Sequence, residues 1–85
     1  MFFNWGRSKP KFHSGQLARI PASKEVPHIR YFLIERRRWI RPNGEVKKRW
    51  VYDGAIFQVL SGELVLTTFG SCFGEENFMK MYHPD

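Results

Sequence analysis

The 85-residue sequence is poor in the residues on which redox and cofactor chemistry depend. Its single cysteine, Cys72, excludes an internal disulfide and favours a reduced, cytoplasmic setting. Spacings typical of metal ligands, such as Cys-x-x-Cys, do not occur, and no glycine-rich stretch is followed by the Lys and Ser or Thr of a phosphate loop. The sequence therefore predicts no metal and no cofactor, and we expect Cys72 to be a small buried apolar residue.

Potential catalytic groups are scattered along the chain. The three histidines, His13, His28 and His83, fall in predicted loops or tails that are far apart in sequence. Glu75 and Glu76 are adjacent, so their carboxylates point apart on a strand and diverge on a helix, and neither arrangement makes a shared acid–base site. We expect a non-enzymatic protein with no catalytic residue.

Long apolar runs are also missing. No stretch approaches the roughly 18 residues that a membrane-spanning helix needs, and the apolar residues 1–5 are too short for a signal peptide. Residues 1–14 predict a loosely ordered basic and aromatic arm, and residues 15–85 predict one small domain. The arm either packs on its own domain, contributes to a partner contact, swaps between protomers or touches a membrane surface through residues 1–11.

Positive charge is concentrated in the first part of the chain. Residues 1–49 hold 13 Lys and Arg against 3 acidic residues, whereas residues 50–85 hold 1 against 5. The formal net charge is +6, and seven of the fourteen basic residues lie within residues 35–50. This asymmetry favours a one-sided electropositive surface that attracts acidic partners.

β-branched and aromatic residues separated by turn signals predict an all-β domain. The expected strands are residues 15–20, 29–40, 45–52, 55–60 and 63–69, with turns at 41–44, 53–54 and 61–62, a loop at 70–74, and one helical turn or a short closing strand at 75–81. The predicted fold is a small five-stranded antiparallel barrel with a long projecting hairpin and a short closing helical turn.

The hairpin around residues 41–44 is the most informative part of the sequence. Arg-Pro-Asn-Gly is a turn sequence, and the register that it implies places Arg38 opposite Lys48 and Arg37 opposite Arg49. The base of this hairpin is apolar and is expected to join the core. Its tip carries cations on both faces, which repel one another unless an anion binds.

An acidic protein surface is the partner that we favour for this hairpin, because arginine and tryptophan are enriched at interface hot spots. Nucleic acid is the alternative, since the same cations contact phosphates and a tryptophan stacks on bases. Trp50, near the base, is expected in the core. The candidate contact residues are Arg36, Arg37, Arg38, Trp39, Arg41, Lys47, Lys48 and Arg49.

The order of elements resembles that of the Src-homology-3-type small β-barrels. The resemblance rests on Gly15-Gln16 after Phe12, on the two long strands that follow, and on the closing residues Phe-Gly-Glu-Glu-Asn-Phe at 73–78, and it covers residues 12–82. It implies a barrel fold. An acidic loop with paired tyrosines is not evident, so binding of proline-rich peptides is not implied.

Overall fold

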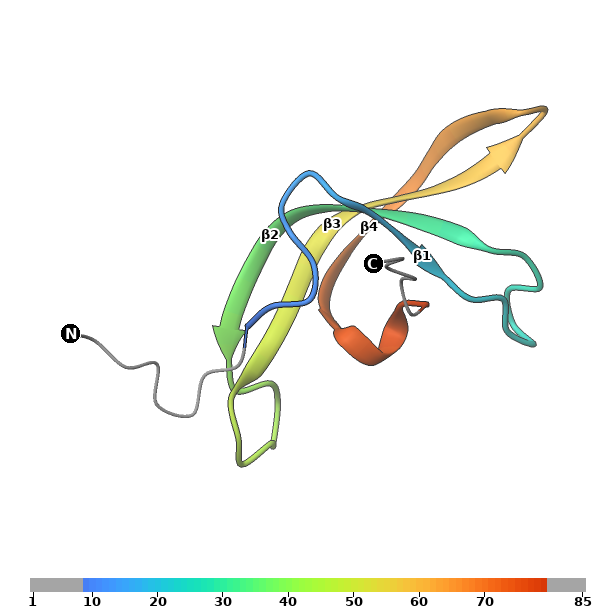
Figure 1. The fold of residues 1–85 in the computed structure, drawn as a ribbon. Coiled ribbons are helices and arrows are strands. Elements are labelled where there is room, and N and C mark those ends of the chain that lie inside the picture. Colours follow the sequence, from blue (N-terminus) through green and yellow to red (C-terminus); the bar gives the residue numbers. More distant parts are fainter. Residues whose placement is uncertain (1–8, 80–85) are drawn as a thin grey trace, which may run out of the picture.

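A computed structural model describes residues 9–79 of the chain (Figure 1). They form one antiparallel sheet in which the four strands follow one another in sequence order. The elements are β1 (Leu17–Ile20), β2 (Arg30–Ile40), β3 (Arg49–Leu60), β4 (Glu63–Gly74) and a 3-10 turn, η1 (Glu75–Asn77). The predicted all-β class is confirmed, and the sheet of the described residues is not closed into a barrel.

The predicted count of five strands differs from the structure because residues 53–54 do not form a turn. Asp53 and Gly54 lie inside β3, which runs without interruption where two strands were predicted. A Cβ atom at position 54 would collide with the carbonyl oxygen of Leu33, so this glycine serves the close approach of β2. The predicted loop at residues 70–74 is likewise wrong, since these residues belong to β4.

The ends of β3 differ. At one end Leu60 pairs with Glu63 across a two-residue turn, in which Ser61 (φ 52°) and Gly62 (φ 80°) are both left-handed. Such a turn matches the twist of the flanking strands, and the predicted turn at 61–62 is confirmed. The β3–β4 hairpin extends beyond the other strands in Figure 1. At the other end, residues 41–48 form a loop between β2 and β3.

The core lies on one face of the sheet, called here the inner face. Phe78, which follows η1, contacts the rings of Phe12, Phe32 and Tyr52 with centroids 5.1–5.9 Å apart. The apolar base of the predicted hairpin joins this core through Ile34, Tyr52 and Trp50, as expected. The buried apolar cluster comprises Phe12, Ala18, Ile20, Phe32, Ile34, Trp50, Tyr52, Ile56 and Phe78.

Both ends of the described chain are fastened to this sheet. Glu75 Oε2 accepts hydrogen bonds from Tyr52 Oη (2.7 Å) and from the backbone N–H of Lys11 (2.9 Å). Burial, together with the hydrogen bond to Glu75, raises the pKa of Tyr52 well above its usual range. Beyond η1, the N–H of Met79 donates to the carbonyl oxygen of Arg19 (2.8 Å), which brings the chain back to β1.

Candidate partner-binding surface

A β-bulge separates the three consecutive arginines of β2. Ile34 pairs with Gly54 and Arg36 pairs with Asp53, so Glu35 is the extra residue in β2. Arg36 and Arg38 therefore share the outer face of the sheet with Asp53, while Arg37 lies on the inner face. The predicted register is wrong here, because β3 begins at residue 49 and not at residue 45.

Asp53 gathers the two outer-face arginines. Its carboxylate accepts hydrogen bonds from Arg38 Nε (2.7 Å) and Nη2 (2.8 Å), from Arg36 Nε (2.9 Å), and from Ser71 Oγ and the backbone N–H of Cys72 (both 3.0 Å). The Asp53 side chain is 15% exposed, and Arg38 is 27% exposed. Two of the predicted contact residues thus already have an acidic partner within the protein.

The charge state of this cluster follows from its contacts. Burial of Asp53 acts to raise the pKa of its carboxyl, but the hydrogen bonds from Arg38, Cys72 and Arg36 outweigh burial and hold that pKa well below its usual range. The hydrogen bond to Asp53 is the main cause of the raised pKa of Arg38. The carboxylate is therefore ionised and paired at neutral pH.

Cys72 lies beside this cluster and is exposed, not buried as predicted. Its backbone is left-handed (φ 59°), and Arg38 Nη2 donates to its Sγ atom at 3.1 Å. Because Asp53 accepts the N–H of Cys72, the thiol is held at the outer edge of β4 and away from the core.

Arg49 is the third predicted contact residue with internal partners. Its guanidinium contacts Glu45 Oε2 (3.0 Å) in the preceding loop and Glu76 Oε1 (2.6 Å) in η1. The hydrogen bond from Arg49 is the first cause of the lowered pKa of Glu76. This arrangement ties one end of loop 41–48 to η1.

The two tryptophans pack against each other on the inner face. The ring centroids of Trp39 and Trp50 are 5.4 Å apart, and the two residues are paired across β2 and β3. Arg37 places its Cζ atom 5.9 Å from the Trp50 ring centroid, and its Nη1 is 3.3 Å from His13 Nδ1. Trp50 is buried as predicted, and Trp39 is half-buried against the core.

Loop 41–48 presents the remaining cations. The Glu45 N–H donates to the Pro42 carbonyl oxygen (3.0 Å) and Gly44 has φ 73°, so the turn lies one residue later than predicted. The basic side chains of this loop are exposed, and within residues 9–79 none of them forms an ion pair. These free cations are Arg41, Lys47 and Lys48.

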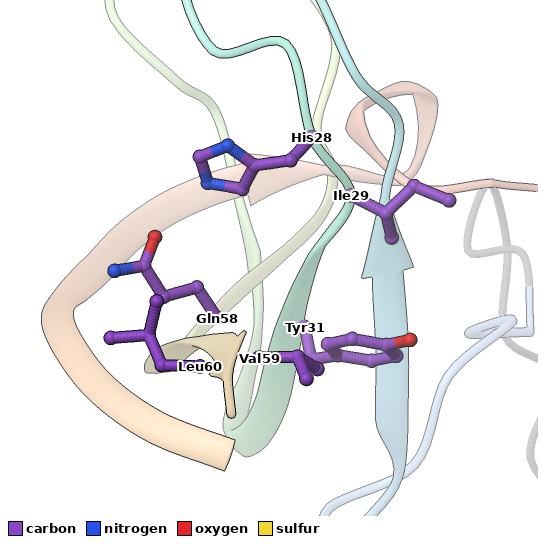
Figure 2. A pocket seen from close by; sticks show the side chains of 6 residues that line it. All are labelled: His28, Ile29, Tyr31, Gln58, Val59 and Leu60. Atoms are coloured by element: carbon purple, nitrogen blue, oxygen red, sulfur yellow. The ribbon is translucent and has the colours of Figure 1, made fainter. Parts of the chain in front are cut away.

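A concave feature lies at the opposite end of β3 from loop 41–48. A hollow of about 430 Å³ is lined by His28, Ile29, Tyr31, Gln58, Val59 and Leu60, as Figure 2 shows. It carries no acidic or basic cluster. In the described part of the chain no group of three His, Cys, Asp or Glu side chains is placed to hold a metal, and no helix there is long and apolar enough to cross a membrane.

Sequence analysis found the basic residues but missed the acidic residues that pair with them. Asp53 falls in a predicted turn, and Glu76 falls in the predicted closing segment 75–81. The signal that pointed to Asp53 was its place as the sole acidic residue in residues 46–62. His83 and the aromatic residues of segment 1–8 lie outside the described residues.

Comparisons with protein-family models, curated proteins and solved structures find no match for this chain. Its function is therefore argued from the charge and geometry of the surface around loop 41–48. The eight predicted contact residues fall into three groups. Three have acidic partners inside the protein, two contact Trp50, and three are free of ion pairs within residues 9–79: Arg36, Arg38 and Arg49; Arg37 and Trp39; and Arg41, Lys47 and Lys48.

Proposed function

We propose that this protein is a non-enzymatic binding or regulatory module that docks an acidic protein surface through loop 41–48. The observation that supports this is the division of its cations. Arg36, Arg38 and Arg49 have acidic partners inside the protein. The three cations of loop 41–48 have none among the described residues, so their charge is available to a partner.

The composition of the loop favours a protein partner. Val46, which is 86% exposed, lies directly before Lys47 and Lys48. An exposed apolar residue beside cations suits an interface that combines a small apolar contact with charge steering. Docking of carboxylates here needs no rearrangement of the Asp53 cluster.

Nucleic acid is the second candidate, because adjacent free cations also suit phosphates. Single-stranded binding normally adds aromatic faces on which bases stack. Here Trp39 and Trp50 contact each other, and Trp50 is buried, so near loop 41–48 the described residues offer no open aromatic face. This geometry favours the protein partner.

The fold is part of the same proposal. We propose that the chain has a fold of the Src-homology-3-type small β-barrels. In support, β1 is followed by a loop, two long strands, a tight hairpin and a 3-10 turn, and the Met79 N–H then reaches β1. The likeness is one of layout, and function is argued from loop 41–48 alone.

The test uses a matched pair of variants. The first carries Lys47→Glu and Lys48→Glu, and the control carries Lys9→Glu and Lys24→Glu, which change the net charge equally at exposed positions elsewhere. Fluorescence anisotropy would measure binding to a labelled poly-glutamate peptide and to single- and double-stranded oligonucleotides at 50 mM and 200 mM salt.

We expect the peptide to bind the wild type and the control alike, and the loop variant to bind at least tenfold more weakly. Oligonucleotide binding below about 10 µM at 50 mM salt, weakened tenfold or more at 200 mM and lost in the loop variant, would establish the nucleic-acid function instead. Equal losses in both double variants would show that only net charge matters, and would overturn the assignment to this loop.

A further inference from the structure

The outer face of the sheet is apolar over the half that includes the β3–β4 hairpin. Opposed residues of neighbouring strands lie on one face, so the register defines this surface. Leu17 pairs with Leu33, Leu33 with Ala55, and Ala55 with Phe69, across all four strands. The larger side chains of this surface, called here the outer apolar face, are Leu17, Tyr31, Leu33, Phe57, Val59, Leu64, Leu66 and Phe69.

This face is open to solvent. Phe69 is 68% exposed, and Leu17, Val59, Leu64 and Leu66 are 42–50% exposed. An antiparallel sheet whose second face meets water normally carries polar side chains there. In this sheet both faces are apolar, and only the inner one is covered by the aromatic side chains on segments 9–14 and 75–79. The composition of the outer apolar face therefore calls for a second layer.

The scarcity of charged residues on the outer apolar face indicates which kind of partner could cover it. Residues 54–74 include one charged residue, Glu63, and its side chain alternates to the face opposite Leu64. Arg19, on the edge strand β1, is the one charged residue in the two cross-strand sets that contain Phe69 and Leu66. Arg19 gives an acidic partner little to pair with here, and a second copy of this surface adds one like charge, on the edge strand β1.

The exposed area also suits a second copy. The five most exposed residues of the outer apolar face are 42–68% exposed and together present roughly 500 Å², the size of a typical functional apolar patch. Two such faces give about 1,000 Å², which reaches the lower limit of a specific protein interface. Loop 41–48 ends just before Arg49, and Ala55, which pairs with Phe69, lies six residues further along β3, about 20 Å away at 3.3 Å per residue. This distance exceeds the Debye length of about 8 Å at physiological salt, so the cations of the loop do not oppose the contact.

We propose that two copies of this chain pack face to face through the outer apolar face, forming a closed two-fold dimer. The contact is isologous, because each copy supplies the same surface. Phe69, which pairs with Ala55, is the most exposed aromatic residue of this face and of the described chain. Each dimer then carries two copies of loop 41–48, and neither lies in the interface.

Sedimentation velocity of the full chain from about 5 to 300 µM, in 150 mM salt, tests this directly. We expect the wild type to pass from the mass of one chain to that of two. Phe69→Lys introduces a charge that dimer formation would bury, so we expect its dissociation constant to rise at least tenfold. The control is Val46→Lys, the same kind of change at an 86% exposed position outside the face, and it should dimerise like the wild type.

Folding of the variants is checked separately from their association. Circular dichroism would show that both variants fold, and Leu66→Lys offers a second substitution on the same face. A wild type that stays monomeric to 300 µM overturns the dimer, as does a Phe69→Lys chain that associates like the wild type. If Phe3→Ser with Trp5→Ser creates a dimer that the wild type lacks, the N-terminal segment is the occupant and the proposal fails. Association that grows without limit would exclude a closed dimer. Binding of a poly-glutamate peptide too short to reach both loops of a dimer should be unchanged in Phe69→Lys, which separates this result from the test of loop 41–48.

Discussion

Replacing Asp53 by asparagine removes one charge from the centre of the outer-face arginine cluster and keeps nearly the same shape. The Oδ1 atom that accepts from Ser71 and Cys72 can be retained. The amide nitrogen then replaces the oxygen that accepts from Arg36 Nε at 2.9 Å and from Arg38 Nε at 2.7 Å. The N–H groups of Arg36 Nε and Arg38 Nε would then face the N–H group of the asparagine amide. Because all three groups are donors, these two hydrogen bonds would be lost.

The expected cost can be worked from exposure. The Arg36 side chain is 66% exposed, so its ion pair contributes at most about 1 kcal/mol. Arg38 is 27% exposed, and its charge-assisted hydrogen bonds to a mostly buried carboxylate contribute about 1.5–3 kcal/mol. We therefore expect Asp53→Asn to lower the free energy of unfolding by about 2–4 kcal/mol, and the Tm of so small a domain by about 10–25 °C.

This difference should depend on pH in a defined direction. The pKa of the Asp53 carboxyl is lower in the folded state than its unfolded value of about 3.9. The stabilisation is therefore complete above about pH 5, and it is lost as the pH falls from the unfolded pKa towards the folded one. The gap between wild type and Asp53→Asn should shrink by about 1.4 kcal/mol per pH unit below 3.9.

Urea denaturation at pH 7, 4, 3 and 2 measures both quantities. Glu63→Gln is the matched control, because it removes one carboxylate from an exposed site that forms no ion pair within residues 9–79. It should change stability by less than about 0.5 kcal/mol. A loss of less than 1 kcal/mol in Asp53→Asn at pH 7, or a gap that stays constant down to pH 2, would refute the account of this cluster.

Two further predictions concern the Tyr52–Glu75 hydrogen bond and the close approach of β2 and β3. Tyr52→Phe removes the 2.7 Å hydrogen bond to Glu75 and should lower the free energy of unfolding by about 1–2 kcal/mol in urea denaturation; an unchanged midpoint would show that this bond is not stabilising. Gly54→Ala should abolish the folded circular dichroism spectrum, because the new Cβ atom meets the Leu33 carbonyl oxygen. Gly44→Ala has no atom within 4 Å of its new Cβ atom, so it should lower the free energy of unfolding by only about 1 kcal/mol, owing to the positive φ of this position. Equal effects of the two alanines would contradict the close approach of β2 and β3.

Residue type and turn chemistry predicted the class of the fold and the tight hairpin, because both depend on local preferences. Asp-Gly at 53–54 misled for a physical reason: the pair has turn propensity, but here Gly54 meets a neighbouring strand and Asp53 binds arginines. A glycine required by close approach has the same sequence signature as a glycine required by a turn. Only the position of Leu33 distinguishes the two.

The charged residues show a second limit. Strict alternation along residues 36–38 predicts which arginines share a face, but the bulge at Glu35 decides which face that is. Nothing in the residue type of glutamate indicates a bulge. The pairing of Arg49 with Glu76, 27 positions apart, also depends on where η1 lies after β4. Long-range partners of this kind follow from the assembled sheet and not from local sequence.

The continuity of β3 has a consequence for avidity. Its 12 residues link loop 41–48 to the outer apolar face through one paired strand, without a hinge. In a face-to-face dimer the two loops would therefore be held at a set separation of tens of ångströms. A partner that repeats its acidic patch at that interval would be bound at both sites with a high effective concentration, whereas one with a different interval would engage a single loop. The length of β3, which contributes to folding in the monomer, would thus set the distance between the two binding loops in the dimer.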